Sequence, residues 1–192
     1  TGQGEAVCAV VAHSRAQAED AAEHVVVRYE ELEPVTDMRT ALEPHIPVIH
    51  TKLGDNLAFE RSLDAGEVDK AFEDADAVAE AEFVFGRHTG VTLEARAILA
   101  DWNPGEGRLT VYQGTQAPHM MQNIFAKHLS LEEAQVRVIC KDVGGSFGIK
   151  VHVYADEMAT AALSKRLKRP VKFVADRIES FVTDIHARDH IC

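Results

Sequence analysis

The alternation of apolar and polar residues divides the chain into three blocks of different character. In the first block, the apolar run at residues 5–12 and the β-branched run at residues 25–29 are typical of buried strands. Between them, Ser14 and Gln17 form a capping-box pattern, which predicts a helix over residues 15–24. The first block is therefore expected to fold as a strand–helix–strand unit.

The second block, residues 34–63, has little periodicity and contains Pro34, Pro44 and Pro47. Prolines and mixed polarity suit neither a helix nor a strand, so this block is expected to be an ordered connector that lies over the surface. A short helix is expected after it, at residues 66–73. The connector should separate the first block from the rest of the chain.

The third block, from residue 76 onwards, predicts strands and helices in alternation. Residues 77–85 alternate imperfectly, as a half-buried strand does, and two further strands flank a turn-rich stretch at residues 103–107, which closes a hairpin. The remaining elements are expected in this order: a helix that starts at Pro118 and continues over residues 120–129, one helical turn capped by Ser130 and Glu133, a strand at 135–141, a glycine-rich loop at 142–150, a helix at 152–167 and a strand at 171–175. The hairpin strands are expected at residues 98–102 and 109–113.

These patterns predict an α/β (α+β) fold with a mixed sheet and helices. Residues 1–33 are expected to be the end of a small α/β domain, residues 34–75 a connector, and residues 76–192 the truncated first part of a second domain. Thr1 at the start and a strongly patterned segment just before Cys192 favour a piece excised from a longer protein, although a processed terminus would look the same.

Charge and cysteine content narrow the possible partners and compartments. The formal net charge of −11 argues against nucleic acid or an anionic membrane, because binding either requires clustered Lys and Arg. Cys8, Cys140 and Cys192 are far apart and form no C-x-x-C pair, which fits neither a disulfide scaffold nor a zinc or iron–sulfur site. A reducing compartment, the cytoplasm, is the simplest explanation. No apolar run approaches the roughly 18 residues of a membrane span.

The glycine-rich loop ending at Lys150 is a candidate ligand site. Three glycines in five positions (144, 145 and 148) allow close backbone approach and positive φ, and amides between a strand and a helix can hold an anion. A P-loop is excluded because Gly144 and Gly148 are one residue too close and Val151 follows the lysine; Ser146 excludes the dinucleotide fingerprint. A tight structural turn remains the alternative.

Gln116 is the second candidate, within the stretch 113–119 at the end of a strand and the start of a helix. Its amide offers both a donor and an acceptor where strand and helix ends usually face a cleft. An ordinary turn glutamine is the alternative. We expect Gln116 and Phe147 to converge on one cleft.

Taken in their order along the chain, these motifs resemble those of the large subunit of the molybdenum hydroxylases. This is the family of xanthine dehydrogenase, aldehyde oxidase and carbon monoxide dehydrogenase. The resemblance is carried by residues 115–119, 136–150 and 170–181, by Ala187-Arg188-Asp189 beyond them, and by Thr92-Leu93-Glu94 before the hairpin. The first block looks like the tail of the smaller α/β domain that precedes the molybdenum-binding region in these proteins. The resemblance covers nearly the whole chain and is weakest in the connector.

The resemblance implies a role for each site residue. Gln116 matches a glutamine that approaches the apical oxo ligand of a molybdenum ion bound by a pterin dithiolene. Gly145, Ser146, Phe147 and Gly148 match a loop whose backbone amides approach the metal's oxygen ligands and the pterin, with the Phe147 position nearest the metal. Many relatives have glycine in place of Ser146 and in place of Ile149. The Ile149 side chain adds bulk to one side of the loop.

The implied parent is a molybdenum-dependent hydroxylase or dehydrogenase. It would oxidise a small carbon substrate, such as an aldehyde or an N-heterocycle, with water as the oxygen source. Val151 stands where purine-oxidising relatives have a glutamate, which argues against xanthine. The family's general-base glutamate lies downstream of Cys192, so no catalytic residue is expected here and the isolated chain should have no turnover.

The resemblance also implies the cofactors and partners. Electrons would pass from a molybdenum–molybdopterin cofactor, in its cytosine dinucleotide form if the source is bacterial, to iron–sulfur centres and FAD on other subunits or domains. The full complex is expected to be a homo-oligomer. Two alternatives stay open: a carbon monoxide dehydrogenase large subunit, whose cysteine-bearing loop would lie downstream, and a non-catalytic assembly or interaction module.

Other polar residues are expected to be structural. The histidines show no metal-ligand spacing, and Asp156 and Glu157 are expected on a solvated helix face. Asp176, Arg177 and Glu179 are expected to form hydrogen bonds around a strand end, and Cys140 to be a small buried hydrophobic residue.

Overall fold

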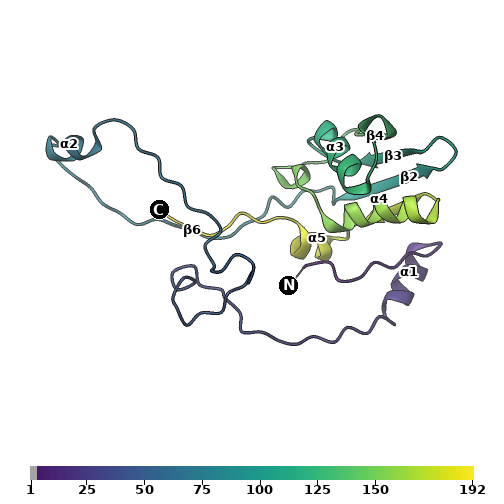
Figure 1. Ribbon diagram of the computed structural model, residues 1–192, viewed down its shortest axis with the longest axis horizontal. Coiled ribbons are helices and arrows are strands. Elements are labelled where there is room, and N and C mark those ends of the chain that lie inside the picture. Colours follow the sequence, from purple (N-terminus) through teal and green to yellow (C-terminus); the bar gives the residue numbers. More distant parts are fainter. Residues whose placement is uncertain (1–3) are drawn as a thin grey trace. The chain divides into compact units, whose positions relative to one another are not determined.

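A four-stranded mixed sheet, in strand order β4–β3–β2–β5, is the main sheet of this computed structural model, which describes residues 4–192 (Figure 1). β2 (Ala97–Asn103) and β3 (Arg108–Gln113) form the predicted antiparallel hairpin. β5 (Val171–Val174) pairs antiparallel with β2, and β4 (Val136–Ile139) runs parallel to β3. The predicted mixed sheet is confirmed.

Two helices contribute to the core of this sheet. α3 (Pro118–Leu129) connects the parallel strands β3 and β4, and α4 (Ala155–Leu167) precedes β5 (Figure 1). Their side chains join alternate residues of the sheet in one cluster: Ile98, Ala100, Leu109, Val111, Met121, Phe125, Ala126, Val136 and Ala161. Because all nine are almost fully buried, this single apolar layer between sheet and helices holds the unit together. The predicted α/β class is confirmed.

Local signals in the sequence fix the ends of several elements. Pro118 lies in the first turn of α3, where its missing N–H costs nothing. Asn103 closes the hairpin turn, since its side-chain oxygen accepts hydrogen bonds from the N–H groups of Gly105 and Glu106. The predicted role of Ser130 is wrong: it ends α3 in the left-handed conformation. The following turn, η1 (Glu133–Gln135), is capped by Glu132, which exchanges hydrogen bonds with Gln135.

The C-terminal third contains two elements that the pattern did not predict. α5 (Arg177–Thr183) begins at a capping box between Asp176 and Glu179. β6 (His190–Ile191) pairs antiparallel with β1 (Val84–Phe85), so only the end of the strand predicted at 77–85 forms. The helix predicted from residue 152 begins only at Ala155, because His152, which follows η2 (Ile149–Val151), and the N-cap Tyr154 are both extended.

The N-terminal block is only partly as predicted. α1 (Arg15–Ala22) forms, and Ser14 caps it by accepting a hydrogen bond from the N–H of Gln17. The strands predicted at residues 5–12 and 25–29 are wrong: neither segment is a strand, and five of their six valines are exposed, Val26 by 83%. A strand forms by pairing with a neighbouring strand, and neither segment pairs with a described strand, although β4 and β5 lie at the edges of their sheet. Residues 1–3 of the predicted small domain lie outside the described residues.

The chain divides into two compact units. One contains Glu82–Cys192 with the described residues up to Glu23, and the other is His24–Ala81. In the second unit, α2 (Val68–Glu73) forms where a short helix was predicted, and the rest is without strands. Asn56 organises part of this unit, since its amide donates to the carbonyls of Ala41 and Pro47 and accepts from the N–H of Ile49. The domain boundaries at residues 33 and 75 stay a prediction.

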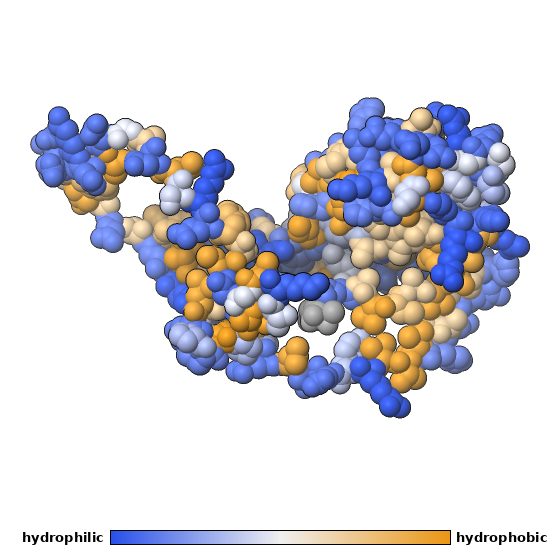
Figure 2. Space-filling model, in the orientation of Figure 1, coloured by the Kyte–Doolittle hydropathy of each residue, from blue (hydrophilic) through white to orange (hydrophobic). Residues whose placement is uncertain are grey.

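Large apolar side chains are exposed in the second unit, visible among the orange residues in Figure 2. Leu32, Phe59 and Leu63 are each about 80% exposed. Buried apolar surface therefore stabilises this unit much less than it stabilises the sheet and its helices. Among residues 4–192, no helix has the length and apolar character that crossing a membrane requires.

Candidate functional site

The glycine loop after β4 has a backbone that only glycine accommodates at key positions. Gly145 and Gly148 have φ values of +100° and +87°, and Phe147 also has a positive φ, +50°. A Cβ on Gly144 would lie 2.6 Å from the Cβ of Glu94, so a larger residue would displace one of the two segments. The loop is therefore held in a conformation that its sequence specifically permits.

The loop presents a row of free donors. Within the described chain, no acceptor pairs with the backbone N–H groups of residues 145–148. Successive free N–H groups in a tight turn can form a concave site for an anionic group. The Phe147 side chain beside them is 76% exposed. The geometry suits a negatively charged ligand or ligand oxygen atoms.

Lys150 joins Gln116 to this loop. The backbone N–H of Gln116 and the hydroxyl of Thr115 both donate to the Lys150 carbonyl, each over 3.0 Å. The Lys150 N–H in turn donates to the hydroxyl of Ser146, over 3.1 Å. The structure therefore brings the Gln116 turn and the loop together. The Gln116 side chain is exposed and bonds to no other described residue, so its amide is free for a ligand.

Glu94 is a residue of this site that the sequence did not single out as functional. Its Oε2 accepts from the N–H of Gly144, over 2.9 Å, and from the ammonium of Lys150, whose side chain is completely buried. The hydrogen bond from Lys150 is the main reason that the pKa of Glu94 lies below its usual range. A buried lysine needs a counter-charge. This requirement was the available signal, but the sequence did not show that Lys150 is buried.

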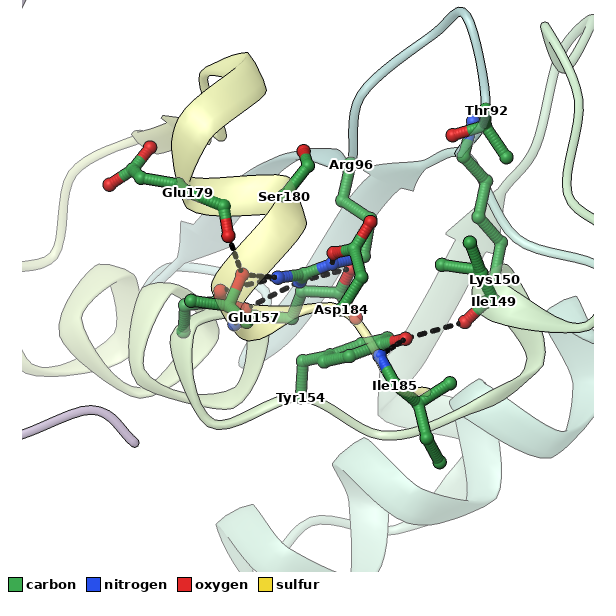
Figure 3. A network of polar contacts seen from close by, with 12 residues as sticks. Thr92, Arg96, Ile149, Lys150, Tyr154, Glu157, Glu179, Ser180, Asp184 and Ile185 are labelled. Carbon is green, nitrogen blue, oxygen red and sulfur yellow. Dashed lines mark hydrogen bonds and ion pairs between the residues drawn. The ribbon is translucent and has the colours of Figure 1, made fainter. Parts of the chain in front are cut away.

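A second polar network surrounds Arg96, which is 1% exposed (Figure 3). Its guanidinium donates to Asp184 over 2.6 Å, to both oxygens of Asp156 over 2.8 Å, and weakly to Glu157. It also lies 3.7 Å from the ring centre of Tyr154. The prediction that Asp156 and Glu157 form a solvated face is wrong, because Arg96 draws both carboxylates inward and leaves Glu157 2% exposed.

Tyr154 connects this network to the glycine loop. Its hydroxyl donates to the carbonyl of Ile149, over 2.8 Å, and accepts from the N–H of Ile185, over 3.2 Å (Figure 3). Burial raises the pKa of Tyr154, so the hydroxyl keeps its proton. The last residues of the loop are thus supported from the Arg96 side as well as by Glu94.

Burial raises the pKa of Glu157 to about 7, although Arg96 opposes the shift. The amide of Gln113 donates to Glu157 over 2.6 Å, while the Gln113 carbonyl oxygen is buried without a partner in the described chain. Both oxygens of Glu157 thus accept hydrogen bonds, one from Arg96 and one from Gln113, and burial outweighs the effect of Arg96 on the pKa.

This shift predicts that the protein becomes less stable as the pH rises. Glu157 binds its proton more tightly in the folded chain than when unfolded, where its pKa is near 4.5. Its contribution is complete below pH 4.5 and is lost as the pH approaches about 7, a change of about 3 kcal/mol. Glu157→Gln, which mimics the protonated acid, should flatten this dependence in urea denaturation measured from pH 5 to 8. An unchanged slope in the variant would assign the dependence to other groups.

The other predicted roles have mixed outcomes. Asp176 and Glu179 are structural, as expected, and Arg177 donates to the Leu93 carbonyl. Cys140 is only partly buried, and its thiol donates to the carbonyl of Thr115. Among residues 4–192, no group of three or more His, Cys, Asp or Glu side chains is arranged to hold a metal ion. A metal that is held by an organic cofactor does not need such a group of side chains. It needs hydrogen-bond donors to the cofactor, which this site offers.

Comparison with known proteins defines the class to which this fold and site belong. Residues 49–192 match the model of the molybdopterin cofactor-binding domain, and the chain belongs to that family. The match covers the glycine loop, Gln116, Glu94 and the Arg96 network. The predicted resemblance is confirmed.

Individual relatives extend this result. The chain is 39% identical over 186 residues to the nicotine 6-hydroxylase large subunit of Paenarthrobacter nicotinovorans, across 97% of this chain and 23% of that protein. It is 32% identical over 201 residues to the carbon monoxide dehydrogenase large chain of Hydrogenophaga pseudoflava, across 98% of this chain and 25% of that protein. The quinoline 2-oxidoreductase structure from Pseudomonas putida 86 matches with a TM-score of 0.84 and 33% identity, across 92% of this chain and 22% of that one. The chain thus spans about a quarter of the length of these relatives.

Proposed function

We propose that this chain provides part of the cofactor site in the large subunit of a molybdenum hydroxylase. The observation that carries the proposal is the row of free N–H groups at residues 145–148, with the Gln116 turn bonded to the end of the same loop at Lys150, in a chain of the molybdopterin cofactor-binding family. Such donors suit the oxygen atoms of an anionic metal–pterin group. The residues present therefore fit the cofactor.

Each site residue then has a distinct task. Gly145, Ser146, Phe147 and Gly148 would bind the pterin and the metal's oxygen ligands through their backbone. Gln116 and Phe147 would lie nearest molybdenum, where the Gln116 amide orients a ligand oxygen without transferring a proton. The bound cofactor supplies the oxidation of a substrate carbon, with oxygen taken from water. The general base would come from another part of the parent protein.

The parent's substrate is proposed to be a small carbon compound, with an N-heterocycle or an aldehyde favoured. Two relatives are named for nicotine and quinoline, which supports the heterocycle. Val151, in place of an acidic residue, leaves no carboxylate after Lys150 to bind a purine. Carbon monoxide is the alternative substrate, supported by the similarity to the Hydrogenophaga pseudoflava protein.

The wider assembly is also part of the proposal. We place the parent in the cytoplasm as a homo-oligomeric complex, with iron–sulfur centres and FAD on other subunits or domains and the cytosine dinucleotide form of the cofactor if it is bacterial. The relatives' names support partner subunits, since they include "large subunit", "large chain" and "subunit gamma". The three free cysteines are compatible with a reducing compartment.

Gly148→Ala tests whether the loop backbone binds the cofactor. Gly148 has φ +87° and an added Cβ would touch nothing within 4 Å, so the change strains the backbone without a clash. Gly54 has φ +89° and equally open surroundings, so Gly54→Ala is a matched control in the other unit. In the full-length parent, Gly148→Ala should lower molybdenum and pterin per protein several-fold, while Gly54→Ala, with the same strain of about 1–2 kcal/mol, keeps both. Equal cofactor content in the two variants would refute the loop assignment.

A further inference from the structure

We infer that Glu94 is a positioning residue, which sets the spacing between Gln116 and the glycine loop by holding both ends of the loop on one carboxylate oxygen. The inference rests on the proposed function, because it concerns how these groups are presented to the cofactor. Glu94 would touch neither the cofactor nor the substrate.

The hydrogen bonds around Glu94 connect the two ends of the loop directly. At the first end, Gly144 donates its N–H to Oε2 of Glu94 and accepts the Glu94 N–H at its carbonyl, over 3.1 Å. At the other end, the Lys150 ammonium binds the same Oε2. Residues 144 and 150 are therefore fixed relative to one oxygen atom, which limits how far the loop between them can open or shift.

Lys150 extends this clamp to Gln116. Its side chain binds Glu94, while its carbonyl accepts the hydrogen bonds of Gln116 and Thr115. A Cβ on Gly114 would lie 3.5 Å from Glu94 Oε2 and 3.8 Å from Lys150 Nζ, so the chain leading to Gln116 passes close to the ion pair. If Lys150 moves, its carbonyl, which accepts the hydrogen bond from the Gln116 N–H, moves with it.

The burial of Lys150 makes Glu94 hard to replace. The Lys150 side chain has no exposed surface, whereas that of Glu94 is 43% exposed. Figure 3 shows the Lys150 side chain extending towards Thr92, whose hydroxyl donates to the Glu94 carbonyl over 2.6 Å. The Lys150 ammonium is thus enclosed by the protein, and the backbone of Glu94 is held in place by Thr92. Without the carboxylate, a buried charge loses its partner and the lysine is driven to move.

The test uses Glu94→Gln in the full-length parent, with Glu106→Gln as control, since Glu106 is an exposed glutamate in the hairpin turn. The first readout is amide hydrogen exchange in peptides that contain Gly144 and Gln116. Exchange at Gln116 should accelerate about tenfold in Glu94→Gln, although Gln116 makes no hydrogen bond to Glu94. The second readout is kcat per bound molybdenum, which should fall about tenfold with KM changed less than twofold. Glu106→Gln should alter neither.

A double variant separates positioning from general stability. In Glu94→Gln/Lys150→Met no unpaired charge remains, so the melting temperature should recover, whereas exchange at Gln116 stays fast and kcat stays low because the clamp is still absent. The core variant Ile98→Val supplies a destabilised protein with an intact clamp, and its kcat per molybdenum should be that of the wild type. Recovery of kcat with stability in the double variant, or an unchanged Gln116 exchange rate in Glu94→Gln, would overturn the inference. Absence of molybdenum from the wild-type parent would overturn the proposed function and this inference with it.

Discussion

Arg96→Met is expected to lower the free energy of unfolding by about 3–5 kcal/mol, because it removes one partner of a buried ionic network. Asp184 is 5% exposed and Asp156 is only partly buried, so both carboxylates would lose their cation in a medium that solvates charge poorly. Glu157, whose pKa is already raised to about 7, would bind its proton more tightly without Arg96. A domain of ordinary stability has about 5–15 kcal/mol in total. The variant should therefore retain little of the folded sheet unit at physiological temperature.

Urea denaturation followed by Trp102 fluorescence measures this loss, since Trp102 is the only tryptophan and lies in β2. The control is Arg137→Met on β4, which makes the same chemical change at an exposed strand position. It should shift the unfolding free energy by about 0.5 kcal/mol or less. If the two variants were equally stable, the Arg96 network would not contribute to folding.

The elements that the sequence predicted correctly are those specified by residues close together in the chain. The hairpin around Asn103, the proline start of α3 and the capped start of α1 each depend on a few neighbouring positions. The glycine loop could also be predicted, because the spacing of its glycines indicates the required backbone conformation. For these parts, local chemistry and the final fold agree.

The polar contacts that were missed depend on partners far apart in the chain, whereas α5 was missed although its capping box joins residues only three positions apart. Arg96 binds Asp184 across 88 positions, and Glu94 binds Lys150 across 56. Nothing near any of these residues shows which opposite charge it will meet. The strands predicted at 5–12 and 25–29 are wrong for a related reason: an apolar run predicts that a segment is buried, but it does not show which strand the segment will pair with.

The candidate site shows both situations together. Gln116 and the loop were identified from their motifs, but their connection through the Lys150 carbonyl became visible only in the folded chain. Two supports, Glu94 and Tyr154, reach the loop from outside it, and nothing in the sequence around either residue shows that it contacts the loop. The residues proposed to contact the cofactor could thus be named from the sequence, whereas the residues that hold this loop in place could not.

Gln116→Ala in the full-length parent is expected to reduce kcat about 10²-fold while leaving the fold intact. The amide would lose one hydrogen bond directed at charge that develops on a metal-bound oxygen, and such donors contribute about this much to rate. Stability should change by roughly 0.5 kcal/mol or less, because the side chain is exposed and bonds to no other described residue. Steady-state kinetics and a thermal melt on the same sample measure both effects.

Two companion variants and the molybdenum content decide what the loss means. Gln116→Glu keeps the shape of the side chain but replaces its N–H donors with negative charge, so it should be at least as inactive as Gln116→Ala. Gln17→Ala removes a glutamine side chain from α1 and should leave activity unchanged. Wild-type kcat in Gln116→Ala at full molybdenum loading would make Gln116 an ordinary turn residue. If molybdenum is lost in parallel with activity, the Gln116 amide acts by holding the cofactor. The backbone hydrogen bond from Gln116 to Lys150, which the variant keeps, would then not be sufficient to retain the cofactor.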